Sequence, residues 1–105
     1  MPKCFFVVRA TVADAGKRAA FDDWYHREHL ADAMAAFKAE KGWRCWSESD
    51  PAVHQATYQL PDKAAADRIV GSAEMKALIA EFDRVWPGIP RMREVFTLAD
   101  ERDGR

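Results

Sequence analysis

The stretch CFFVVRATV at residues 4–12 decides the fold class. β-Branched and aromatic residues fill it, and these residue types are enriched in β-strands. Successive side chains of a strand alternate between the two faces of a sheet. Phe6 and Val8 therefore lie on one face, and Phe5 and Val7 lie on the other. Because both faces carry large apolar groups, we expect both faces of the sheet to be covered.

A helical pattern follows this strand. Asp14 can cap a helix, and from Lys17 onward apolar side chains recur at three- and four-residue steps. The apolar face around Phe21 is rotated from the face that begins at Leu30, which predicts a bend near residue 31. A glycine commonly follows the last helical residue, so we expect Gly42 to end this helical stretch.

Three further strands and a second helical region complete the pattern. Residues 43–48 and 53–60 alternate like strands, and the turn at Ser49-Asp50-Pro51 joins them into a hairpin. A helical region begins at Pro61-Asp62 and is interrupted at Gly71-Ser72. It continues as an apolar stripe to Trp86, and residues 91–98 form the last strand.

The order of elements is therefore βαββαβ. Right-handed crossovers turn two such units into a ferredoxin-like α+β fold, with a four-stranded antiparallel sheet and the helices on one face. The first and third strands are central in this fold. We expect one domain over residues 1–99 and a polar tail over residues 100–105. The remaining apolar sheet face predicts a homodimer, packed sheet on sheet with twofold symmetry as a dimeric α/β barrel.

Composition narrows the partners and the compartment. The 105 residues include 16 basic and 17 acidic side chains, so the charge balance favours neither nucleic acid nor a membrane surface as a partner. No apolar run reaches the roughly 18 residues that span a bilayer. Cys4 and Cys45 lack the spacing of a zinc site or a disulfide framework. We expect two buried, reduced thiols in a cytoplasmic protein.

The segment at residues 21–30, FDDWYHREHL, is the richest in chemically active side chains. Tyr25 and His29 are one helical turn apart, so a hydroxyl and an imidazole could reach one group between them. An imidazole changes protonation near neutral pH and can act as acid or base, and Glu28 could orient it. His26 and Arg27 point to solvent. The alternative is a structural His29, packed against aromatic rings with one nitrogen satisfied.

Tryptophans and strand arginines are candidate ligand contacts. Trp46 and Trp86, together with Trp24 of the helix, could line a flat apolar pocket, although packing in a core or interface is the more common role of such rings. Trp43 and Trp46 lie on opposite faces of one strand. Arg9 and Arg93 stand in otherwise apolar strands, where each needs an acidic partner or could bind a ligand carboxylate or enolate.

Motifs for cofactors and metals are not evident. The sequence contains no GxGxxG, P-loop, GxSxG or haem-attachment pattern. His26, His29 and His54 lack the spacing of a complete ligand set, so we expect no metal site. Chemistry based on a nucleotide cofactor or a catalytic serine is therefore disfavoured, and we expect no cofactor.

The segment at residues 21–30 resembles the F-x-x-W-Y-x-x-E-H-(L/I) helix of EthD-like proteins in the dimeric α/β-barrel superfamily. Ala31 stands where a proline commonly follows in that family. The resemblance implies a pocket between helices and sheet, with His29 as acid or base and Tyr25 and Trp24 beside it. It also implies cyclic, aromatic or polyketide-like substrates, some of which related proteins oxidise without metal or flavin.

Two functions remain open from the sequence. The first is a small cofactor-independent isomerase, cyclase or monooxygenase that acts on a cyclic or aromatic apolar substrate through His29. The second is a non-catalytic homodimer that binds a small ligand or serves an accessory role. A cavity of roughly 300 Å³ with His29 in its wall would favour a ligand site, and a closed core around His29 would favour a structural role.

Overall fold

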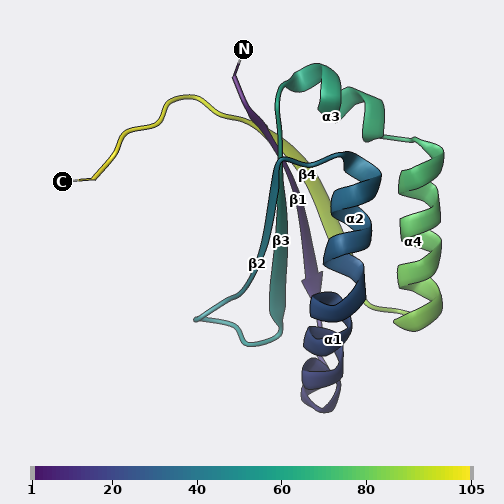
Figure 1. Ribbon diagram of the computed structural model, residues 1–105. Coiled ribbons are helices and arrows are strands. Elements are labelled where there is room, and N and C mark those ends of the chain that lie inside the picture. The colour runs from purple at the N-terminus through teal and green to yellow at the C-terminus, as the bar shows by residue number, and fades with distance from the viewer. Residues whose placement is uncertain (1, 105) are drawn as a thin grey trace.

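The computed structural model describes residues 2–104. Met1 and Arg105, the first residue of the expected domain and the last of the expected tail, lie outside the described residues. Figure 1 follows the chain through strands and helices in the order β1 (Cys4–Thr11), α1 (Arg18–Trp24), α2 (Leu30–Phe37), β2 (Lys41–Trp46), β3 (Val53–Leu60), α3 (Lys63–Ile69), α4 (Ala73–Val85) and β4 (Arg91–Thr97). The order is βαββαβ, with each helical crossover divided in two.

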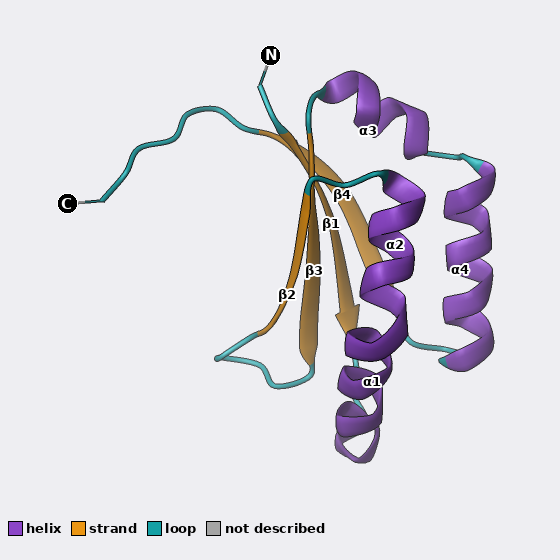
Figure 2. Cartoon of the chain, in the orientation of Figure 1, coloured by secondary structure: helices purple, strands orange, loops and turns teal. Residues whose placement is uncertain are grey.

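The sheet confirms the ferredoxin-like prediction. Its strand order is β2-β3-β1-β4 with every neighbouring pair antiparallel, so β1 and β3 are central as expected. Figure 2 shows the helices together on one side of the sheet. The register pairs Phe6 with Tyr58 on one side and with Val95 on the other. The helix-facing residues of the three strands thus form a continuous row.

Aromatic rings dominate the core between sheet and helices. Phe21 of α1 is fully buried and contacts the rings of Trp24, Tyr25, Trp46, His54, Phe82 and Trp86. Both parts of the second crossover start at side-chain caps. Asp62 accepts a hydrogen bond from the backbone of Ala65 at 2.9 Å, and Ser72 accepts one from Met75 at 3.1 Å.

The first helical region ends earlier than the sequence predicts. Its last helical residue is Phe37, and Lys38 adopts a left-handed conformation with φ 52°. Gly42 therefore lies within β2 rather than at a helix end. A Cβ atom at this position would lie 2.8 Å from the sulfur of Met34. The side chain of Met34 on α2 thus approaches β2 closely at this glycine, and a larger residue here would require that side chain to shift.

A π-helical turn, Tyr25–His29, joins α1 to α2 and replaces the bend expected near Ala31. A π turn contains one more residue than an α turn, because its hydrogen bonds run from i to i+5. The helix therefore continues without a break, and the wider winding absorbs the extra residue so that the helix on either side keeps its facing. Such turns are frequent at functional sites.

The second sheet face has no covering element in the described chain. Trp43, Met92 and Phe96 are 41%, 47% and 47% exposed there. Cys45 is also exposed, which corrects the expectation of two buried thiols, because its strand β2 is at the sheet edge and its side chain points away from the helices; Cys4 is buried. We call this surface the open face.

Residues 98–104 form neither helix nor strand, and Figure 1 shows them leading away from the sheet.

Over residues 2–104, no helix has the length and apolar character needed to cross a membrane.

Candidate functional site

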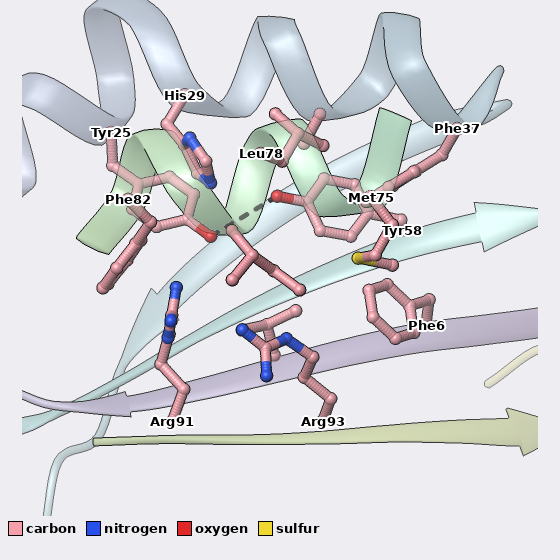
Figure 3. A pocket seen from close by; sticks show the side chains of 13 residues that line it. Phe6, Tyr25, His29, Phe37, Tyr58, Met75, Leu78, Phe82, Arg91 and Arg93 are labelled. Atoms are coloured by element: carbon pink, nitrogen blue, oxygen red, sulfur yellow. Dashed lines mark hydrogen bonds between the residues drawn. The ribbon is translucent and has the colours of Figure 1, made fainter. Parts of the chain in front are cut away.

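A cavity lies between α2, α4 and the helix-facing side of the sheet (Figure 3). Its enclosed volume is about 30 Å³, and one side is open to solvent. The lining side chains are mostly apolar or aromatic, with His29, two tyrosines and two arginines among them; they belong to Phe6, Val8, Tyr25, His29, Ala33, Phe37, Tyr58, Met75, Leu78, Ile79, Phe82, Arg91 and Arg93. This volume is well below the 300 Å³ that we expected of a ligand site.

His29 reaches the cavity from the π-helical turn. His29 is only 7% exposed. Its imidazole stacks on the indole of Trp24, with 4.5 Å between the ring centroids and 19° between the ring planes. Edge contacts to Tyr25 and Phe82 hold the other sides of the ring. Within residues 2–104, no protein group makes a hydrogen bond to either ring nitrogen, and neither nitrogen is among the fully enclosed polar atoms that lack a partner. The ring nitrogens are therefore accessible to solvent or to a ligand in the cavity.

Burial sets the protonation state of His29. Burial, together with the positive charge of Arg91 and against the opposing charges of Asp32 and Glu81, lowers the pKa of the imidazole from 6.5 to about 4. The ring is therefore neutral at neutral pH. A neutral imidazole with a free nitrogen can accept a proton, so the arrangement fits a base better than an acid.

Two tyrosines place hydroxyl groups in the same cavity. The hydroxyls of Tyr25 and Tyr58 lie 3.4 Å apart, within hydrogen-bond distance. Burial raises the pKa of both phenols, so both are protonated. One hydroxyl proton is used in their mutual hydrogen bond, and the other is left for a group in the cavity. Figure 3 shows His29 and Tyr25 pointing from the helix toward the strands.

Two arginines enter the cavity from β4. Arg91 donates a hydrogen bond to Asp83 at 2.5 Å, and its guanidinium lies 3.9 Å above the ring of Phe82. Arg93 points into the cavity from the next residue on the same side of the strand (Figure 3). In the described chain Arg93 has neither an ion pair nor a side-chain hydrogen bond.

A polar network supports Tyr25 from behind. One carboxylate oxygen of Asp22 accepts hydrogen bonds from Arg44 and from the indole of Trp46, both at 2.8 Å, and these two contacts lower the pKa of Asp22. Arg44 also lies 3.4 Å from Nε2 of His54, whose ring is 4.6 Å from that of Tyr25. Burial lowers the pKa of His54 to about 4, and its Nδ1 has no hydrogen-bond partner in the described chain.

The structure brings together only part of the residue set expected from the sequence. His29 and Tyr25 line the cavity. Trp24 stacks on His29 but does not reach the cavity. Trp46 and Trp86 pack around Phe21 behind it. These three indoles therefore form the support of the site rather than its wall.

Two expected ligand contacts lie away from the cavity. Glu28 is exposed. Successive residues of a π turn are rotated by a smaller angle about the helix axis than those of an α-helix. The angle between the Glu28 and Tyr25 side chains is therefore larger than α-helical spacing predicts. Arg9 is on the open face and donates hydrogen bonds to Gln55 at 2.6 and 3.2 Å. Strand alternation separates Arg9 from His29. His26 and Arg27 are exposed, as expected.

Tyr58 and Arg91 were not among the candidates from the sequence. Both can be found from strand alternation, since Tyr58 shares the helix-facing side of β3 with His54 and Arg91 shares that of β4 with Arg93. The sequence alone does not show which side of either strand faces the helices. Over residues 2–104 there is no group of three or more His, Cys, Asp or Glu side chains that could hold a metal ion.

Comparisons with known proteins indicate the fold. No protein-family model matches the sequence, and no curated protein matches it. The cofactor-independent oxygenase SnoaB from Streptomyces nogalater, solved in a mutant form, superposes with a TM-score of 0.70 at 17% identity, over 96% of this chain and 97% of SnoaB.

Two other solved structures give the same result. An antibiotic biosynthesis monooxygenase superposes with a TM-score of 0.61 at 11% identity, over 94% of this chain and 99% of the other. A dimeric ferredoxin-like protein from an uncultured marine organism gives 0.60 at 14% identity, over 97% and 100%. The chain has the ferredoxin-like fold of antibiotic biosynthesis monooxygenase-type proteins.

Proposed function

We propose that the protein is a small cofactor-independent enzyme in which His29 removes a proton from a cyclic or aromatic apolar substrate. One observation carries this proposal. His29 is a largely buried, neutral imidazole that faces a cavity, and its ring nitrogens are accessible and make no hydrogen bond to another group of residues 2–104. One of these nitrogens is therefore free to accept a substrate proton.

The similar structures support an oxygenase among the possible reactions. SnoaB is a cofactor-independent oxygenase with the same fold. The motif at residues 21–30 supports placing the chain with EthD-like proteins within this superfamily. Both likenesses are consistent with an apolar ring as substrate, since aromatic and aliphatic side chains make up most of the cavity wall.

The chemistry begins with one proton transfer. His29 takes a proton from an acidic C–H or O–H group, and the electron pair stays on the substrate as an enolate or phenolate. The free hydroxyl proton of the Tyr25–Tyr58 pair can donate a hydrogen bond to that oxygen. The anion then regains the proton at another carbon, or attacks a carbonyl carbon within the same molecule, whose oxygen takes up the proton. Alternatively it reacts with dioxygen, so that a ring CH2 becomes C=O with one oxygen atom while the other leaves as water, and the substrate itself supplies the four electrons. These steps correspond to an isomerase, a cyclase and a monooxygenase.

Substrate entry requires the cavity to widen. An enclosed volume of about 30 Å³ admits a molecule of roughly the size of water or dioxygen. Leu78 and Ile79 of α4 and the unpaired Arg93 of β4 are partly or fully exposed and form the side that can move. We propose that these side chains turn outward when substrate binds.

A turnover assay tests the role of His29. Aromatic and polyketide-like compounds are first screened by tryptophan fluorescence, and those that bind are followed by chromatography and mass spectrometry. We expect His29→Ala to lower turnover by about 10²–10⁴-fold. The exposed His26→Ala variant is the control and should keep full turnover. A loss of less than about twofold in His29→Ala would refute the proposal.

The same assay separates the second candidate function. A compound that binds with unchanged affinity in His29→Ala and is never converted would indicate a non-catalytic binding protein. For the enzyme, kcat/KM should rise with pH through about 4 and then stay level to neutrality, because a base of that pKa must be unprotonated.

We also propose that a second copy of the chain covers the open face. This face combines exposed Trp43, Met92 and Phe96 with one basic and one acidic residue, Arg9 and Glu94, which suits packing against an identical surface. One of the similar structures is a dimeric ferredoxin-like protein.

Sedimentation at micromolar concentration tests the homodimer. The wild-type chain should sediment as a dimer, and Met92→Asp should sediment as a monomer. Val70→Asp is the matched control, because Val70 is 60% exposed but lies next to α3, away from the open face. A monomeric wild-type chain, or a dimer that persists in Met92→Asp, would contradict the arrangement.

A further inference from the structure

The charges of the cavity are all of one sign. Arg91 and Arg93 line it, His29 is neutral, and none of the lining side chains in the described chain is a carboxylate. Asp83 offsets only Arg91, from an exposed position on α4. Arg93 is exposed at the open side of the cavity and has no acidic partner in the described chain, so its guanidinium is available to a ligand that brings one negative charge.

We infer that the ligand of this cavity carries a carboxylate, which Arg93 binds at the β4 side while the rest of the molecule faces His29 and Tyr25. The inference rests on the proposed function and specifies its substrate class. It names an aromatic or cyclic acid rather than a neutral ring.

The geometry distinguishes the two arginines. Arg91 is fixed, with Asp83 at one nitrogen and Phe82 beneath its plane, and its side chain is 10% exposed. It contributes a positive field but has few free donors. None of the N–H groups of the Arg93 guanidinium donates a hydrogen bond within residues 2–104. Its planar pair of N–H groups matches the two oxygens of a carboxylate.

The orientation of a bound acid follows from Figure 3. Both arginines rise from β4 on one side of the cavity, and His29 and Tyr25 point toward them from the helix on the other. A carboxylate on Arg93 would therefore place the remainder of the ligand between the strand and the imidazole. Burial lowers the pKa of Arg91, and the positive charge of Arg93 adds to this effect; the same anion would relieve the repulsion between the two guanidinium groups.

Binding of benzoate and benzamide tests the inference. The two molecules have nearly the same shape, but only benzoate is charged. Dissociation constants are measured by NMR titration of the ¹⁵N-labelled protein at pH 7, with shifts of the His29 and Tyr25 amides reporting the cavity. We expect benzoate to bind about tenfold more tightly than benzamide, because charge-assisted hydrogen bonds are roughly twice as strong as neutral ones.

Two variants test whether Arg93 causes the preference for benzoate over benzamide. Arg93→Met should reduce this preference to less than about twofold and leave the affinity for benzamide unchanged. Arg9→Met, a matched change on the open face, should keep the tenfold preference. Folding of each variant is checked by the dispersion of the same spectra.

The outcomes separate this inference from the proposed function. Equal binding of both probes at the cavity, or a preference for benzoate that persists in Arg93→Met, would contradict the binding of a carboxylate by Arg93. Either result would leave the proposed role of His29 unaffected. If neither probe shifts His29 or Tyr25 at the highest concentration soluble, the inference is overturned together with the ligand-binding cavity. A preference confined to shifts on the open face also overturns it.

Discussion

The two faces of the sheet come from the same four strands, but they have different surroundings. On the helix side, Phe6, Tyr58 and Cys4 are buried beneath aromatic rings, and the polar groups His29 and His54 are enclosed and neutral at neutral pH. On the open face, Phe96 and its neighbours remain in contact with solvent. The difference teaches that the buried core belongs to one face, which also holds the site of the proposed chemistry, while the other face is left for the proposed self-association.

The largest effect should come from removing a ring on the helix side. Phe21→Ala empties a fully buried position among six rings and should lower the free energy of unfolding by about 3–5 kcal/mol. Phe96→Ala on the open face should cost less than about 1 kcal/mol in a monomer and weaken self-association instead. Urea unfolding at several protein concentrations measures both. Similar losses for the two variants would remove the distinction between the faces.

Acid should destabilise the helix side through its buried histidines. The folded-state pKa of about 4 for His29 and His54 is below the ordinary 6.5, so the unfolded chain binds more protons between these pH values. Stability is therefore present above pH 6.5 and is lost as pH falls toward 4, by about 3 kcal/mol for each histidine over the whole window.

Denaturant unfolding at pH 7 and pH 5 measures this effect. In His29→Gln, the stability difference between the two pH values should shrink by about 2 kcal/mol, since 1.5 pH units of that window are covered. The exposed His26→Gln variant should leave the difference unchanged. A difference that is the same in both variants would show that His29 does not titrate as a buried group.

The smallest effect compares two tryptophans of β2. Trp46→Phe keeps a ring against Phe21 but removes the N–H that Asp22 accepts, and should cost about 1 kcal/mol. Trp43→Phe, three residues away on the open face, should cost less than about 0.5 kcal/mol. Thermal unfolding of the two variants under one condition gives the comparison, and equal costs would mean that the indole hydrogen bond contributes nothing.

Most of the fold was predictable because alternation and helical spacing are local properties of the sequence. The strand CFFVVRATV and the interrupted second helix lie where these patterns predict them, and the hairpin forms as predicted except that its first strand is Lys41–Trp46 rather than residues 43–48. The end of α2 at Phe37 was not predictable, since Gly42 looks like a helix terminator but lies within β2, where the side chain of Met34 packs closely against it. That contact joins residues on different elements, which a local pattern cannot reveal.

The site was predictable only on the element that carries the motif. His29 and Tyr25 lie on one helical turn, so their proximity follows from spacing alone. Tyr58, Arg91 and Arg93 reach the cavity from two strands, and their sides depend on pairing over more than 30 residues. Arg9 and Arg93 look alike in sequence, because each stands in an apolar strand, and the sheet places them on opposite faces.

The π-helical turn at Tyr25–His29 has a consequence for how this chain tolerates length changes. A π turn is equivalent to one residue inserted into a continuous α-helix, and its wider winding absorbs the insertion so that the helix on either side keeps its facing. Deleting one residue between Tyr25 and His29 would restore α-helical winding and leave α2 against the sheet, with Phe37 and Ala33 still in the core. The deletion would instead change the spacing between Tyr25 and His29, whose ring centroids are now 4.9 Å apart. The extra residue thus affects the candidate site more than the packing of the helices.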